Sequence, residues 1–263
     1  MYTCNITVWN IVFTIATRKR LIRKLQRPLR LKELQGCAVE LMKGTSYPSV
    51  DNFIAALEDE GIIQRYTLEA QNGRRIPLYC SQSLTEVNAY ELVSSALPDG
   101  YFCNITAVYH HSLTNQVPSA VYWCDEKLAP RAHRPSEALS DAKIRNAFVK
   151  PHRHTGFVLQ HNGHDILITA GTRGAAHGVE QVQHKHSPCP AGSRVTCLER
   201  TLIDAVVSPH YSGGIMSLCD YFRAAHGQLD IARMLDIYRR LAFVYPYAQS
   251  IGFLMEHCGM SQQ

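Results

Sequence analysis

Apolar residues recur at spacings of three and four over the first 60 residues of the chain, which is the periodicity of amphipathic helices. The pattern predicts three helices, over residues 8–26, over residues 31–42, and from Ser46 or Tyr47 to Gly61. A proline or a glycine ends each of them, because proline lacks the amide hydrogen that a helix needs and glycine accepts a left-handed terminal conformation.

The pattern then changes to two short runs of apolar, β-branched and aromatic residues. Residues 62–68 and 74–79 flank a segment that ends in Asn72-Gly73, and Asn-Gly between two such runs is a strong signal for a β-hairpin. Three helices followed by a hairpin with a basic tip are the element order of a winged helix. We therefore predict a winged helix-turn-helix domain over residues 1–82.

The remaining chain predicts a larger α+β domain, over residues 83–263. Ser83-Leu84-Thr85-Glu86 has the spacing of a capping box and predicts a helix that extends to about Leu97. Short antiparallel strands are expected, including a second Asn-Gly hairpin over residues 156–169. The other predicted elements are helices over 104–111 and 136–147, a strand over 120–123, a long loop over 171–193, and C-terminal helices over 196–207, 213–226, 230–242 and 246–258.

The net charge of the chain lies entirely in its first 80 residues. They contain 12 Lys and Arg against 7 Asp and Glu, whereas residues 81–263 contain 15 of each. The basic cluster before the first acidic residue, Glu33, consists of Arg18, Lys19, Arg20, Arg23, Lys24, Arg27, Arg30 and Lys32. Cations at this density are suited to neutralising phosphates, so double-stranded DNA is the predicted partner.

Base recognition is expected from the front of the third helix. Ser46, Tyr47, Ser49 and Asn52 are polar there, and a recognition helix offers its N-terminal residues to base edges in the major groove. Arg65, Arg74 and Arg75 of the hairpin would contact the DNA backbone or the minor groove.

Cysteine usage and the N-terminal residues indicate a cytoplasmic protein. The nine cysteines are an odd number at uneven spacings and contain no CxxC, so we expect reduced thiols. The apolar run over residues 6–16 is too short to span a bilayer, and its basic cluster follows it rather than preceding it. A helix on a membrane surface is the alternative for this run.

The histidines of residues 150–190 raise the possibility of a metal site. His184, His186 and Cys189 have short metal-ligand spacing, but flanking prolines and the lack of a firm fourth ligand favour a polar loop, so we predict no metal and no cofactor. The upstream histidines are His152, His154, His161, His164 and His177. A His-dependent metalloenzyme or nuclease built on this segment is the alternative function.

Other catalytic patterns are absent from the sequence. A nucleotidyltransferase needs a Gly-Ser turn followed by a carboxylate pair that binds magnesium, but Gly192-Ser193 leads only to Glu199. A nuclease of the restriction type needs a carboxylate followed by Glu-x-Lys, and Glu180 and Lys185 after Asp165 do not have that spacing. The sequence contains no P-loop and no Gly-x-Ser-x-Gly, so we predict that the chain is not an enzyme.

Three segments of the second domain resemble the AbiEi-type antitoxins of type IV toxin–antitoxin systems. The segment from Asn104 to Pro118 is similar to that family's helix and "hGLTxQxP" segment, and Val195 to Asp204 with Ser212-Gly213-Gly214 resembles its "ERTLxD…GG" segment. The tail from Tyr247 to Met255 is similar to its last helices. The resemblance covers about residues 83–258, with a predicted winged helix in front, as that family has.

The resemblance implies a repressor that binds an inverted repeat in the promoter of its own operon. It also implies a C-terminal domain that counteracts a nucleotidyltransferase toxin without a stable complex. Glu199, Arg200 and Asp204 are then candidates for toxin neutralisation, although Glu199 and Asp204 diverge by about 140° on a helix. Arg200 and Asp204, four residues apart, share a face, and an ion pair that holds the helix is expected from that spacing. A module that binds a protein partner directly, with the winged helix as a tether, is a further alternative.

Overall fold

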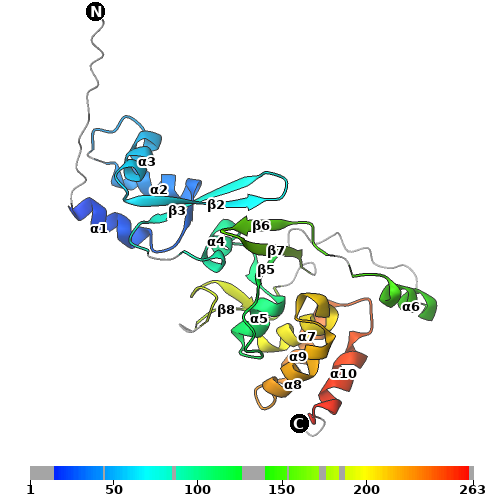
Figure 1. The fold of residues 1–263 in the computed structure, drawn as a ribbon. Coiled ribbons are helices and arrows are strands. Elements are labelled where there is room, and N and C mark those ends of the chain that lie inside the picture. Colours follow the sequence, from blue (N-terminus) through cyan, green and yellow to red (C-terminus); the bar gives the residue numbers. More distant parts are fainter. Residues whose placement is uncertain are drawn as a thin grey trace, which may run out of the picture. The chain divides into compact units, whose positions relative to one another are not determined.

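The computed structural model shows a mixed α and β protein, as the sequence predicts (Figure 1). The structure describes residues 15–43, 45–84, 87–125, 140–152, 154–171, 176–183 and 187–260. Its contacts divide the chain into two compact units, Met1–Thr67 with Pro77–Val87 and Leu68–Ile76 with Asn88–Gln263. The tip of the first hairpin therefore belongs with the second unit.

The first unit contains three helices and a small sheet. Its elements are α1 (Ile15–Lys24), β1 (Leu29–Arg30), α2 (Leu31–Leu41), α3 (Val50–Asp59), β2 (Ile63–Ala70) and β3 (Arg75–Ser81). The three helices and the hairpin occur in the predicted order, and residues 8–14 of the first predicted helix lie outside the described residues. The strand β1, which pairs antiparallel with β3 through Leu29 and Tyr79, was not predicted.

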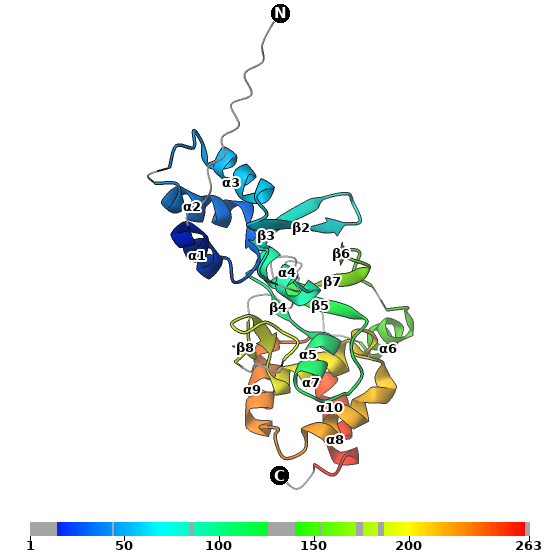
Figure 2. The ribbon, with the colours of Figure 1, turned by 60° about the vertical axis from the view of Figure 1, so that its left-hand side comes forward.

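The core of the first unit forms where the apolar stripes of its helices meet. Leu21 of α1, Leu25 just after it, Leu34 of α2, and Phe53 and Leu57 of α3 are all buried in one cluster. Figure 1 and Figure 2 both place α2 between α1 and α3. The side of α1 that faces away from this cluster is left to its basic residues.

The second unit has a sheet of six further strands beside the tip of β2. These are β4 (Tyr101–Phe102), β5 (Ala120–Asp125), β6 (Val158–His161), β7 (His164–Ala170), β8 (Val179–Gln181) and β9 (Arg194–Thr196). From the tip of β2 the order is β6, β7, β5, β4, β9 and β8. The predicted short antiparallel strands are present in the pairs β4–β5, β6–β7 and β8–β9, but β5 also pairs in parallel with β7 and β4 in parallel with β9. Long connections separate these strands along the chain, and parallel pairs require such connections.

Two local predictions in this unit are wrong. The first helix does not begin at the Ser83 capping box: α4 (Ala89–Ala96) is capped by Asn88, whose side chain and that of Glu91 bond reciprocally to the backbone. The segment 171–193 is not a loop throughout, because it contains β8, which pairs with β9. The pairing partner of β8, rather than any local alternation of residues, makes it a strand.

The second Asn-Gly hairpin is confirmed. It joins β6 to β7, and its two central residues, Asn162 and Gly163, have φ values of +48° and +79°. Positive φ at both positions is what a tight two-residue hairpin requires, and Asn and Gly tolerate it best.

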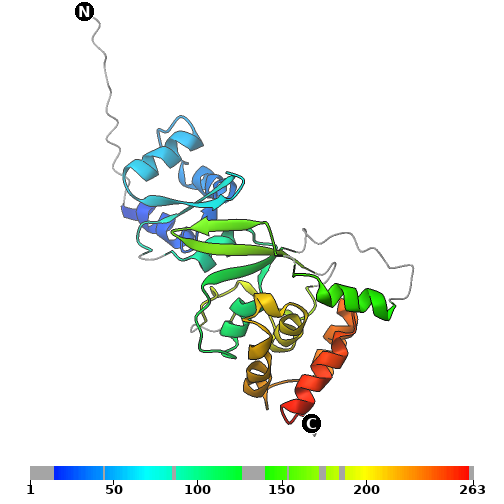
Figure 3. The ribbon, with the colours of Figure 1, turned by 45° about the vertical axis from the view of Figure 1, so that its right-hand side comes forward.

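Helices complete the second unit and supply most of its core. They are α5 (Asn104–His110), α6 (Asp141–Val149), α7 (Leu198–Val207), the 3₁₀ turns η2 (Pro209–Tyr211) and η3 (Ile215–Ser217), α8 (Leu218–Ala225), α9 (Ile231–Leu241) and α10 (Tyr247–His257). The predicted C-terminal group of helices is confirmed, and Figure 3 shows it, in yellow to red, on one side of the sheet. Leu202, Ile203 and Phe222 are fully buried at its centre. Among the described residues, no helix is both long enough and apolar enough to span a bilayer.

Candidate nucleic-acid interface

The basic residues of α1 lie on its exposed side. Leu21 and Leu25 are 2% and 1% exposed and anchor the helix to the core, whereas Lys19, Arg20 and Arg23 are exposed. The helix has no acidic residue in its first turn. The fixed apolar face therefore holds a cationic face toward solvent, and we call Lys19, Arg20 and Arg23 the α1 cation set. The side chain of Arg18 lies outside the described residues.

Three of the predicted phosphate-binding cations are paired with acidic residues of α2. Lys24 contacts Glu40, and the Glu33 carboxylate lies 3.4 Å from Arg27 Nη2 and 3.7 Å from Arg30 Nε. The hydrogen bond between Lys24 and Glu40 raises the pKa of Lys24 and lowers that of Glu40. Exposed pairs of this kind are weak, but each must be opened or shared before its cation neutralises a phosphate.

The α1 cation set, with Lys32 and Arg65, forms no ion pair with any residue that the structure describes. Of these, Lys19, Arg20 and Arg23 lie within five residues on one helix, so their charges act together. This short stretch is the strongest candidate for contact with a nucleic-acid backbone.

The front of α3 has two structural and two exposed polar residues. Ser49 is the N-cap, and its hydroxyl accepts a hydrogen bond from Asn52 N at 3.2 Å, so α3 begins at Val50 rather than at Ser46 or Tyr47. The Tyr47 ring packs edge-on against Phe53 at 5.2 Å, and burial raises its pKa. Ser46 and the side chain of Asn52 remain exposed for recognition.

The charge of α3 limits how it can approach a duplex. The helix has no basic residue, and Asp51, Glu58 and Asp59 give it negative charge at both ends. Asp51 accepts a hydrogen bond from Gln35 Nε2 of α2 at 3.2 Å. Favourable contacts with DNA are therefore offered by the exposed Asn52 amide of its first turn and by the Ser46 hydroxyl that precedes the helix.

The tip of the first hairpin places two arginines in solvent. Gly73 has φ +79°, and Asn72 Oδ1 accepts a hydrogen bond from Arg74 N at 3.1 Å, which fixes the turn. Arg75 Nε lies 3.0 Å from Glu69 Oε1, whereas Arg74 forms no ion pair with a described residue. The β2 edge near this tip pairs with β6 through Glu69 and Ala70, so it is not a free strand.

The predicted ion pair on α7 is present and buried. Arg200 Nε lies 2.7 Å from Asp204 Oδ1, and the two side chains are 3% and 16% exposed. Arg200 Nη1 also donates to His177 O at 2.9 Å. Burial raises the pKa of Asp204, and the guanidinium opposes that shift. This geometry fixes α7 to the segment before β8 and leaves little of either side chain for a partner.

Glu199 is also turned inward. One carboxylate oxygen accepts a hydrogen bond from Asp230 N at 3.3 Å, and the other lies 3.4 Å from Arg233 Nη1. The side chain is 4% exposed. Glu199 therefore ties α7 to the start of α9.

The histidines do not assemble a metal site among the described residues. No group of three or more His, Cys, Asp or Glu has suitable geometry in that part of the chain, and His184 and His186 lie outside it. Cys189 is buried, and burial raises its pKa to about 12, which disfavours the thiolate that binds metals. His161 is buried in β6 and His164 is exposed in β7.

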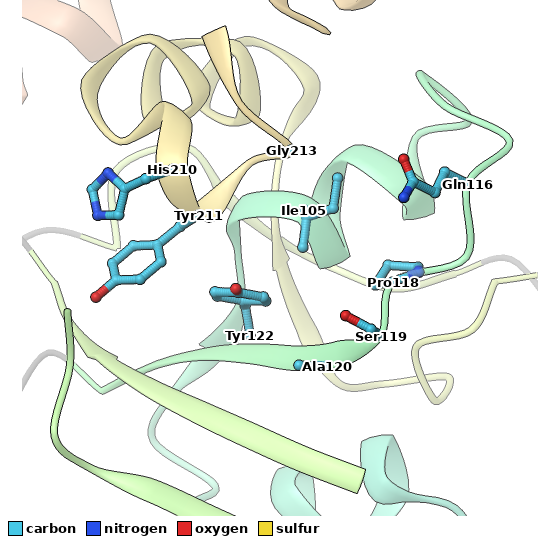
Figure 4. A pocket seen from close by; sticks show the side chains of 9 residues that line it. All are labelled: Ile105, Gln116, Pro118, Ser119, Ala120, Tyr122, His210, Tyr211 and Gly213. Carbon is cyan, nitrogen blue, oxygen red and sulfur yellow. The ribbon is translucent and has the colours of Figure 1, made fainter. Parts of the chain in front are cut away.

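The second unit contains a pocket that was not predicted from the sequence. Its cavity of about 170 Å³ is lined by residues that include Gln116, Tyr122, His210 and Tyr211 (Figure 4). Two of the segments singled out by resemblance, those around Gln116 and Gly213, meet at this pocket. The resemblance of these two segments was the available sequence signal for the pocket. Because Gln116 and Gly213 lie about a hundred positions apart, no local sequence pattern predicts that they meet.

No protein-family model matches the chain, and a search of curated proteins finds no significant match either.

Proposed function

We propose that the chain is a DNA-binding transcriptional repressor that binds DNA through its first unit, which contains the helices of the predicted winged helix. The observation that carries this proposal is the α1 cation set, which lies exposed on a helix anchored by buried leucines and forms no ion pair with a described residue. Like charges held together without acidic partners favour a polyanion, and duplex DNA is the polyanion that three helices and a hairpin suit best.

In this proposal the contacts divide between positioning and recognition. The α1 cation set and Lys32 hold the phosphates, while Ser46, which precedes α3, and Asn52, in its first turn, contact bases. Arg65 and, separately, Arg74 of the hairpin tip would each add a phosphate contact. Four further cations can bind phosphates only after their ion pairs with carboxylates open: Lys24, Arg27, Arg30 and Arg75.

We further propose that the second unit belongs to an antitoxin of the AbiEi type that counteracts a nucleotidyltransferase toxin. Its support is the resemblance of three segments, together with two ion pairs, Arg200 with Asp204 and Glu199 with Arg233, which give one of those segments a structural reason for its residues. In this proposal the two ion pairs stabilise the unit, and other residues carry the neutralising effect.

The repressor proposal is tested by competition between two duplexes. The full chain is titrated, at moderate salt, against fluorescent DNA from upstream of its own coding region and against a shuffled duplex of equal length and composition. We expect the upstream DNA to bind at least about 1,000-fold more tightly, which is the lower end for specific DNA-binding proteins. Equal affinity for the two duplexes would overturn the proposal.

The antitoxin proposal has a separate test. The full chain is expressed together with a nucleotidyltransferase encoded beside it, and rescue of growth is measured with the toxin under an unrelated promoter. Rescue without repression is expected under that promoter. Growth arrest that the full chain does not relieve would exclude this role while leaving the DNA-binding proposal intact.

A further inference from the structure

The pocket of the second unit is bounded by elements that lie far apart in the sequence. Ile105 comes from α5, Gln116 and Ser119 from the segment before β5, Tyr122 from β5, and Tyr211 from η2. Figure 4 shows the rings of His210 and Tyr211 on one side and Gln116, Pro118 and Ser119 on the other, with Ile105 between them. The pocket therefore has an aromatic side and a polar side.

The aromatic side is a connected surface of three rings. The Tyr122 and Tyr211 rings are 5.6 Å apart at 55°, and the His210 and Tyr211 rings are 4.1 Å apart at 45°. Thr155 N donates to Tyr211 Oη at 2.5 Å, which fixes that ring. A fixed aromatic surface next to a cavity favours a flat ring that stacks on it.

The polar side offers hydrogen bonds to the edge of such a ring. The exposed Gln116 amide has both donors and an acceptor, and Ser119 has a hydroxyl that serves as either. Burial, with a smaller effect of Tyr211, raises the pKa of Tyr122, so the phenol keeps its proton. An amide paired with a hydroxyl is a common means of reading the edge of a nucleobase.

Imidazoles cluster beside the aromatic side. The His152 ring stacks on His210 at 4.5 Å and 13°, and the His154 ring meets His210 edge-on at 5.4 Å. An imidazole N–H donates hydrogen bonds, so three imidazoles in contact can offer several donors to an anionic group. A ligand that has a flat ring and a phosphate matches both parts.

We propose that this pocket binds a nucleotide, with its base packed against the mutually tilted rings of Tyr122 and Tyr211, its edge bonded to Gln116 and Ser119, and its phosphate beside His152, His154 and His210. The cavity of about 170 Å³ is smaller than the roughly 300–1,000 Å³ of drug-sized sites, which suits a single base rather than a larger ligand. The site is separate from the α1 cation set and does not depend on the proposed DNA binding.

The test measures binding of defined probes to the full chain by calorimetry. The probes are AMP, GMP, CMP and UMP, the corresponding nucleosides, and a single-stranded RNA of five nucleotides. We expect at least one probe that contains phosphate to bind, its nucleoside to bind more weakly, and Gln116→Ala/Ser119→Ala to weaken binding about fivefold or more, the lower end for loss of one good base contact.

Matched variants separate the site from its surroundings. Gln249→Ala/Ser250→Ala removes the same two side-chain types from exposed positions on α10 and should leave affinity unchanged. Arg20→Ala/Arg23→Ala should also leave it unchanged, which distinguishes this pocket from the DNA interface. Because Gln116 and Ser119 are exposed, their replacement does not threaten folding.

The two sources of a nucleotide give different results. Binding of a mononucleotide supports a free nucleotide as the ligand, and binding of the oligonucleotide alone supports a nucleotide within a strand. Absence of binding by every probe, or binding that Gln116→Ala/Ser119→Ala leaves undiminished, would overturn the proposal.

Discussion

Removal of the Asp204 carboxylate should destabilise the second unit severely. In Asp204→Ala the Arg200 guanidinium, 3% exposed, loses the oxygen that lies 2.7 Å from Nε and keeps, among the described residues, only its hydrogen bond to His177 O. A buried charge without its partner typically costs about 3–5 kcal/mol of unfolding free energy. We expect a loss of that size.

The control is an ion pair with the same chemistry at the surface. Arg223 Nη1 lies 3.0 Å from Asp220 Oδ1, but these side chains are 54% and 74% exposed. Asp220→Ala should cost at most about 1 kcal/mol, because water solvates the arginine that remains. The two variants differ chiefly in burial.

Urea unfolding followed by tryptophan fluorescence measures both losses. The chain has two tryptophans, and Trp123 is buried in the second unit, so a Trp9→Phe background makes the signal report on Trp123 alone. Arg200→Met/Asp204→Leu should recover most of the stability, since apolar pairs often replace buried ion pairs at little cost. Equal losses for Asp204→Ala and Asp220→Ala would refute the reasoning, as would a double variant no more stable than Asp204→Ala.

Two further predictions concern the packing and the pH dependence of the second unit. Gly100→Ala should destabilise it by about 1–3 kcal/mol or more, because a Cβ would lie 2.0 Å from Trp123 Nε1 and 2.5 Å from the Cys124 carbonyl oxygen. Gly36→Ala in α2 is the control: a Cβ there would have no neighbouring atom within 4 Å, so this variant should be neutral or stabilising. Thermal unfolding measures both. Burial lowers the pKa of His111, which is 2.6 Å from the Thr196 carbonyl oxygen, so the unfolded state binds more protons and stability should fall as the pH drops below about 6.5. His111→Gln should reduce the difference in unfolding free energy between pH 7.5 and pH 5.5, and an identical difference in both proteins would show that His111 is not its source.

The sequence predicted those elements whose signals are local. The Asn162-Gly163 hairpin was found because its turn needs positive φ at two positions, and the C-terminal helices were found because their apolar stripes face one core. The Ser83 segment has the same capping spacing as Asn88 and Glu91, but Ala89, Leu92 and Val93 are the residues that pack into the interior. Burial, which the spacing does not encode, decided between the two caps.

The candidate sites were less accessible to sequence reasoning. The cationic character of α1 could be read from composition, but the pairing of Lys24 with Glu40 depends on the packing of α1 against α2. The strands β1 and β4 have two residues each and exist only through their neighbours. The pocket joins Gln116 to Tyr211 through the tertiary fold, which no spacing along the chain anticipates.

The most direct measurement of the proposed DNA interface is the salt dependence of binding to the upstream duplex. Arg20→Ala/Arg23→Ala should lower the slope of log affinity against log salt concentration by about 0.9 for each lost phosphate contact. Arg223→Ala/Arg239→Ala removes the same charge from the second unit and should leave the slope unchanged. A slope that responds equally to both pairs, or to neither, would contradict the assignment of the α1 cation set to DNA phosphates.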